Sequence, residues 1–136
     1  MSKLNQIMTK NKTIIYLIIT FILSFIIRSI YIQTTPLLWD EASLGYNAYS
    51  ILKTSKDEYG SFLPIIFKSF GDYKPGLYVY LSIPFIYIFG LNEFSIRLPS
   101  IILGSLLPIL VYLLIKQINP KAHKTAIISV IVLALN

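Results

Sequence analysis

The stretch of sequence that decides the fold is TIIYLIITFILSFIIRSIYI, residues 13–32, which is apolar along almost its whole length. About 20 apolar residues in a helix span the hydrocarbon core of a bilayer, so this stretch predicts a membrane helix. Lys3, Lys10 and Lys12 precede it, and basic residues beside a span favour the cytoplasmic side. We therefore expect a cytoplasmic N-terminus, with a loop on the outer face of the cell membrane after residue 32.

The whole chain has the composition of a protein whose solvent is largely lipid. Of its 136 residues, 55% are hydrophobic and only 13% are charged, whereas soluble domains carry about 25% charged residues. The net charge of +6 is dispersed among apolar segments, and this dispersal argues against nucleic acid as a partner. Without cysteine the chain can form no disulfide or thiolate metal site, and its single histidine, His123, cannot build a metal centre alone.

Three further apolar segments follow the first, at residues 77–89, 98–115 and 125–136. They predict a single all-α integral membrane domain over residues 1–136, which crosses the membrane several times. The last segment has only about twelve residues, fewer than the roughly 20 that a crossing needs. We therefore expect the chain to be the N-terminal piece of a larger helical bundle, with its fourth span truncated.

The long polar stretch at residues 33–76 forms the expected outer loop and holds five of the six acidic residues. Its first part predicts an amphipathic helix lying at the membrane interface. The apolar residues at helical spacing are Leu44, Ala48, Ile51 and Leu52. Glycines and prolines interrupt the rest of the stretch, for which we expect an irregular loop.

The segment at residues 77–89 allows two topologies. Its thirteen residues would make a helix of about 20 Å, which is short for a crossing, and Pro84 interrupts its hydrogen bonding. If the segment crosses, the basic loop after the third apolar segment lies outside, against the positive-inside tendency. If it is re-entrant, the conflict disappears and Arg97 shares the outer face with Asp40. We expect the crossing, because helical extension through Lys74-Pro75 and Gly90 would lengthen the segment and one basic loop is weak evidence against it.

Asp40 and Glu41 are adjacent carboxylates just beyond the first span. One interpretation is structural, since acidic residues cap a helix N-terminus and complement its dipole. The other is catalytic, with one carboxylate acting as a general base on a hydroxyl while the other orients it or binds a metal. The pair permits a divalent cation without requiring one, so the metal and cofactor content is unknown from the sequence.

Lys74 and Arg97 are the candidate basic half of the same site. Each stands at the start of an apolar segment, where a cation can simply reach the headgroups or anchor the helix. Alternatively, Lys74 holds the phosphate of a lipid carrier and stabilises it as a leaving group. Both alternatives stay open at the level of the residues alone.

Residues 36–113 resemble the N-terminal part of the GT-C glycosyltransferases of the protein O-mannosyltransferase and lipid A aminoarabinose transferase type, which are similar to glycosyltransferase family 39. Three ordered motifs carry the resemblance. They are Trp39-Asp40-Glu41-Ala42 with Tyr46 and Ala48, Asp72-Tyr73-Lys74-Pro75 with Leu77-Tyr78, and Gly90-Leu91-Asn92-Glu93-Phe94-Ser95-Ile96-Arg97-Leu98-Pro99-Ser100 with Gly104. The resemblance implies the N-terminal part of a GT-C multi-helix bundle.

The resemblance also implies an activity, the transfer of a sugar from a polyprenyl-phosphate donor to an acceptor on the outer face. Asp40, with Glu41 beside it, would stand at the catalytic centre, and Lys74, with Arg97, would bind the donor phosphate. Gly76 departs from the family, many of whose members have a second proline there. The competing hypothesis is a non-catalytic polytopic membrane protein, such as a transporter or lipid-handling subunit. The sugar and the acceptor are not specified by the sequence.

Overall fold

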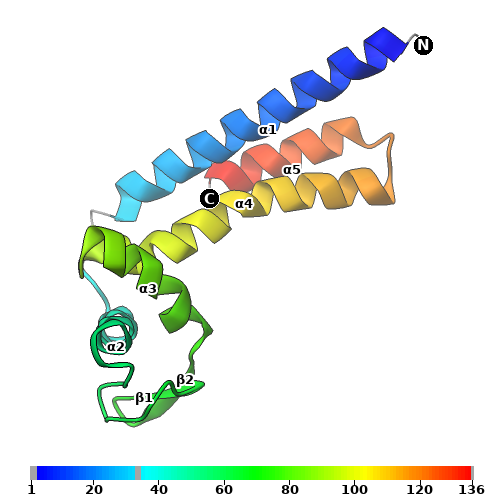
Figure 1. Ribbon diagram of the computed structural model, residues 1–136. Coiled ribbons are helices and arrows are strands. Elements are labelled where there is room, and N and C mark those ends of the chain that lie inside the picture. Colours follow the sequence, from blue (N-terminus) through cyan, green and yellow to red (C-terminus); the bar gives the residue numbers. More distant parts are fainter. Residues whose placement is uncertain (1–2, 33–34, 136) are drawn as a thin grey trace. The chain divides into compact units, whose positions relative to one another are not determined.

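The computed structural model describes residues 3–32 and 35–135, which form five helices and one two-stranded sheet (Figure 1). In chain order the elements are α1 (Lys3–Ile32), α2 (Trp39–Thr54), β1 (Ile66–Ser69), β2 (Asp72–Pro75), α3 (Leu77–Phe89), α4 (Glu93–Ile118) and α5 (His123–Leu135). The chain divides into two compact units. We call Met1–Ile30 with Ile101–Asn136 the helical unit, and Tyr31–Ser100 the loop unit.

In the part of the chain that the structure describes, two helices are long and apolar enough to cross a membrane. These candidate spans are Lys12–Ile30 in α1 and Glu93–Ile118 in α4. The mostly helical fold and the two spans agree with the all-α membrane class expected from the sequence. Helices α3 and α5 have 13 residues each, fewer than the roughly 20 that a crossing needs. That they too are membrane segments stays a prediction.

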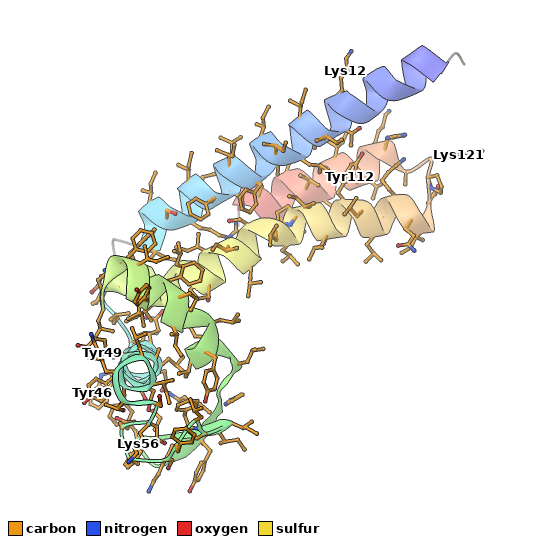
Figure 2. The ribbon with its side chains drawn as sticks, viewed as in Figure 1. Lys12, Tyr46, Tyr49, Lys56, Tyr112 and Lys121 are labelled. Carbon is orange, nitrogen blue, oxygen red and sulfur yellow. The ribbon has the colours of Figure 1, made fainter. Side chains whose placement is uncertain are left out.

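The helical unit is held together by small and aromatic side chains between its helices. Tyr112 of α4 is buried with Ala126 and Val130 of α5, and three further residues pack against this cluster: Tyr16, Leu17 and Ile115. Within this unit α4 runs opposite to α1, and α5 runs back along α4 (Figure 1). Lys12 and Lys121 consequently lie toward the same end of the unit (Figure 2).

Arg28 is a charged residue near the end of the first span, and it contacts both other helices of the helical unit. Its guanidinium donates to the hydroxyl of Ser24 and, over 3.0 Å, to the carbonyl of Leu133 in α5. Gly104 of α4 leaves room for it, because a Cβ there would lie 3.0 Å from Arg28 Nε. Partners of this kind are what a cation at membrane depth requires.

The loop unit is built around the packing of α2 on α3. Its buried apolar core consists of Ala48, Ile51, Phe67, Val79, Ile86 and Ile96, and Leu44 and Leu52 pack against this core. The apolar stripe expected on residues 44–52 is therefore covered by protein rather than by lipid. Helix α2 exists at the expected place, whereas its position at the membrane interface stays a prediction.

The sequence predicted an irregular loop at residues 66–75, where the structure has an antiparallel hairpin. Strands β1 and β2 pair from Ile66 opposite Pro75 to Ser69 opposite Asp72. The two turn residues, Phe70 and Gly71, have φ angles of 47° and 90°, as in a type I′ turn, whose twist suits a two-residue hairpin. The all-α expectation is thus wrong for this short segment.

Gly76 joins β2 to α3 at a point where the backbone is crowded. Its N–H donates to the carbonyl of Ile65 over 2.8 Å. A Cβ at this position would lie 2.6 Å from the same carbonyl oxygen and 2.7 Å from the ring of Phe67. Glycine is therefore required here by close packing and by its N–H, and proline could not supply that donor.

Candidate active site

Asp40 and Lys74 form an ion pair at the surface of the loop unit. Asp40 lies in the first turn of α2, and its carboxylate Oδ1 is 2.5 Å from Lys74 Nζ. The Asp40 side chain is 77% exposed and that of Lys74 is 17% exposed. The carboxylate is therefore accessible to an incoming molecule. The Lys74 stem is largely buried, and its ammonium group reaches the exposed carboxylate.

The register of the hairpin is what points Lys74 at α2. Lys74 is paired with Phe67 across the two strands, and paired residues project from the same face of a sheet. Phe67 is 1% exposed and belongs to the core that α2 covers. Its partner Lys74 therefore lies on the face toward α2. We call this face of the hairpin, with Phe67, Ser69, Asp72 and Lys74, the inner hairpin face.

Glu41 has a different partner from its neighbour, Asp40. Consecutive residues on an α-helix point about 100° apart, so the two side chains leave α2 in different directions. Glu41 Oε1 accepts from Nε of Arg97 at 2.9 Å, and Oε2 accepts from the Nη2 group at 2.6 Å. Oε2 also accepts from the backbone N–H of Leu38 at 3.0 Å. This last bond is the helix-capping role that the sequence left open.

Arg97 is also bonded to the backbone between α1 and α2. Its Nη1 group donates to the carbonyls of Ile32 and Thr35, at 2.8 and 2.9 Å, and its Nη2 group donates to that of Pro36 at 3.0 Å. Counting the two bonds to Glu41, both amino groups and Nε are engaged. The Arg97 side chain is 7% exposed. Its hydrogen bonds fix the backbone that leads into α2.

The surroundings of Glu41 lower its pKa. The hydrogen bond from Arg97 is the largest cause, partial burial acts in the opposite direction, and the Leu38 backbone bond adds to the lowering. Glu41 is thus held as the carboxylate at neutral pH. An ionised, fully partnered carboxylate is suited to fixing geometry and is poorly suited to accepting a proton.

A cavity of about 500 Å³ opens beside this second ion pair. Its volume is within the usual range for small-molecule sites, about 300–1,000 Å³. Apolar side chains and a few polar groups line it: Ile32, Thr35, Pro36, Leu38, Glu41, Arg97 and Ser100. The lining combines an apolar wall with one ion pair, a mixture that suits an amphiphilic ligand.

Among residues 3–32 and 35–135, no cluster of three or more His, Cys, Asp or Glu side chains could hold a metal ion. Asp40 and Glu41 are each paired with a cation, Lys74 and Arg97 respectively. The candidate site is therefore made of two ion pairs, Asp40–Lys74 and Glu41–Arg97.

Sequence reasoning did not single out Tyr78 for this site. Its hydroxyl donates to the carbonyl of Ile96 and lies 2.9 Å from the Ser100 hydroxyl. Tyr78 therefore ties the start of α3 to the part of α4 that carries Arg97. The signal available in advance was the place of Tyr78 in the second matching motif, four residues after Lys74.

The comparison with protein families decides what kind of protein carries these pairs. The sequence model of the dolichyl-phosphate-mannose-protein mannosyltransferases matches residues 17–136, a range that includes all four charged residues of the site. The chain belongs to that family. The resemblance seen in the sequence is thereby confirmed.

Membership in the mannosyltransferase family makes the chain a membrane protein of the glycosyltransferase class. The family name specifies a dolichyl-phosphate-linked sugar as donor, which is a polyprenyl-phosphate sugar. Searches of curated proteins and of solved structures found no match.

Proposed function

We propose that the protein transfers a sugar from a polyprenyl-phosphate donor to an acceptor on the outer face of the cell membrane, with Asp40 and Lys74 as its reacting groups. The observation that carries the proposal is the 2.5 Å ion pair between these residues, in which the carboxylate stays largely exposed. It brings a base and a phosphate ligand to one place, from residues 34 positions apart in the chain.

The chemistry is a single displacement that inverts the anomeric centre. Asp40 takes the proton of an acceptor hydroxyl as the acceptor oxygen bonds to the anomeric carbon. The bond from that carbon to the phosphate oxygen breaks, and its electron pair leaves with the polyprenyl phosphate. Lys74, a compact point charge, pairs with the phosphate as its negative charge grows.

Glu41 and Arg97 receive a supporting role in this proposal. The sequence predicted Glu41 as a second catalytic carboxylate and Arg97 as a second phosphate ligand. Here they bind each other, and Arg97 also holds three backbone carbonyls ahead of α2. We therefore assign them the positioning of Asp40, and we assign the phosphate contact to Lys74.

The arrangement of the helical unit supports a topology in which α3 does not cross. Helices α1 and α4 run in opposite directions, and Lys12 and Lys121 lie toward one end (Figure 2). Basic residues favour the cytoplasmic side, so this end is cytoplasmic in the proposal. The chain between the two spans then begins and ends outside. This favours the re-entrant topology for residues 77–89 over the crossing expected from the sequence.

Transfer from labelled polyprenyl-phosphate mannose tests the proposal in membranes that carry the full-length protein. Asp40→Asn should lower transfer about 100-fold or more, the usual contribution of a general base. Asp72→Asn is the matched control, because Asp72 is an exposed acid on the strand that carries Lys74 and lies outside the ion pair. Equal transfer by the two variants would refute the role of Asp40.

A second variant separates the lysine from the carboxylate. Lys74→Met keeps the length of the stem and removes the charge, so it should raise KM for the donor and slow departure of the phosphate. Release of free polyprenyl phosphate measures the reaction without knowledge of the acceptor. Unchanged KM and kcat in Lys74→Met would show that the phosphate binds elsewhere.

A further inference from the structure

The β1–β2 hairpin has a second face that neither the core nor the active site uses. Side chains alternate along a strand, and the burial of β1 follows this rule, exposed at Ile66 and Lys68 and buried between them. Their partners across the ladder are Pro75 and Tyr73. We call these four residues the outer hairpin face.

The outer hairpin face is apolar and strongly exposed in the described part of the chain. Ile66 is 59% exposed and Tyr73 is 67% exposed, and Ile65, next to the strand, is 84% exposed. Apolar surface left in water raises the free energy of the folded chain. A two-stranded hairpin that shows these side chains together is expected to have a binding partner.

The chain leads directly from this face into an apolar helix whose outer side is also uncovered. After Gly76, α3 begins with Leu77, which is 72% exposed, and near its end Tyr87 and Ile88 are 75% and 66% exposed. The side of α3 that is buried packs in the core of the loop unit. The exposed apolar surface of the hairpin thus continues along the sequence into that of α3.

The residue types on the hairpin identify a lipid surface as the partner. Tyrosine and lysine are typical of the membrane–water interface, where a ring sits at headgroup level and a lysine reaches phosphate. Lys68 is the cation of the outer hairpin face, and its Nζ lies 5.3 Å from the centre of the Tyr59 ring. A lysine amid exposed aliphatic side chains suits the headgroup layer, where its stem lies among apolar groups and its charge reaches lipid phosphate.

We propose that the outer hairpin face docks into the headgroup layer of the membrane, with Ile66 and Tyr73 among the lipids and Lys68 on anionic headgroups. The inner hairpin face then carries Lys74 on a strand that rests on the bilayer. The proposal depends on the membrane location of the chain and does not depend on sugar transfer. It stands or falls separately from the roles of Asp40 and Lys74.

Single cysteines test the docking sharply, because the chain has none of its own. Ile66→Cys and Tyr73→Cys report on the outer hairpin face. Asp72→Cys is the matched control, since Asp72 is the neighbour of Tyr73 and lies on the inner hairpin face. Each variant carries a nitroxide label and is placed in vesicles of three parts phosphatidylcholine to one part phosphatidylglycerol.

Paramagnetic relaxation by oxygen and by a water-soluble nickel chelate then gives the surroundings of each label. The proposal expects more oxygen and less nickel contact at positions 66 and 73 than at 72. Nickel contact equal at all three positions would overturn it, and so would low contact with both reagents at 66 and 73, because that result means a protein partner. The emission of Trp39, which packs against Phe70, checks that each variant retains the hairpin.

Discussion

Replacing Glu41 with glutamine should destabilise the loop unit although the side chain barely changes its shape. The carboxylate accepts two bonds from Arg97, at 2.9 and 2.6 Å, and one from the Leu38 N–H. The amide of Glu41→Gln replaces one acceptor oxygen with a donor, which then faces other donors. Arg97, 7% exposed, keeps its backbone carbonyls and loses its counter-ion.

The size of the effect follows from these bonds. A hydrogen bond to a charged group contributes about 1.5–3 kcal/mol, and removing one partner of a buried ion pair costs about 3–5 kcal/mol. Glu41 is 31% exposed, so water replaces part of what is lost. We expect the free energy of unfolding to fall by about 2 kcal/mol, a factor of about 30 in the unfolding equilibrium.

Trp39, the only tryptophan of the sequence, makes the change measurable. It is the first residue of α2 and packs against Phe70, with ring centroids 5.8 Å apart. Denaturant unfolding in lipid nanodiscs, followed by its emission, compares Glu41→Gln with Asp40→Asn. The Asp40 side chain is 77% exposed, so Asp40→Asn should change stability by less than about 0.5 kcal/mol. Equal losses in the two variants would refute the distinction between the carboxylates.

Three further predictions use the same unfolding assay. Below about pH 4 the difference in free energy of unfolding between the wild type and Glu41→Gln should shrink. A carboxylate of lowered pKa stabilises the fold above its unfolded pKa, about 4.3, and this stabilisation is lost as the pH falls through the folded pKa. A constant difference in stability down to pH 3 would contradict the pairing of Glu41 with Arg97. Gly76→Ala should cost about 1–3 kcal/mol, because its Cβ would lie 2.6 Å from the carbonyl oxygen of Ile65, and an unchanged midpoint would show that the backbone can shift there. Asn47→Ala removes buried bonds to the backbone and side chain of Glu58; it should cost about 1–3 kcal/mol and speed hydrogen exchange around residue 58, whereas unchanged exchange would exclude Asn47 as the anchor of that loop.

The long helices could be predicted because lipid leaves few alternatives to them. Backbone N–H and C=O groups in hydrocarbon must form hydrogen bonds within the protein, so a run of about 20 apolar residues predicts an α-helix. The hairpin at residues 66–75 was missed because four-residue strands are too short to show a period. Its turn, Phe70-Gly71, also lacks the Asn-Gly or Asp-Gly pair that usually signals this geometry.

The types of charged residue in the site were readable from the sequence, and their pairing was not. Asp40 and Glu41 are adjacent in the sequence, which suggests a shared role. On a helix, however, their side chains point in different directions. Their partners, Lys74 and Arg97, are 34 and 56 residues away. Which partner each one meets depends on the hairpin register and on the turn before α2, and both are set by tertiary packing.

The two-residue turn of the hairpin also restricts how this sequence can change length. Because side chains alternate faces, one residue inserted or deleted between Ser69 and Lys74 would exchange the positions of Tyr73 and Lys74. The lysine would then point away from Asp40 although every residue of the motif was still present. We therefore expect homologous chains to tolerate substitutions at Phe70 more readily than a single-residue insertion or deletion in this turn.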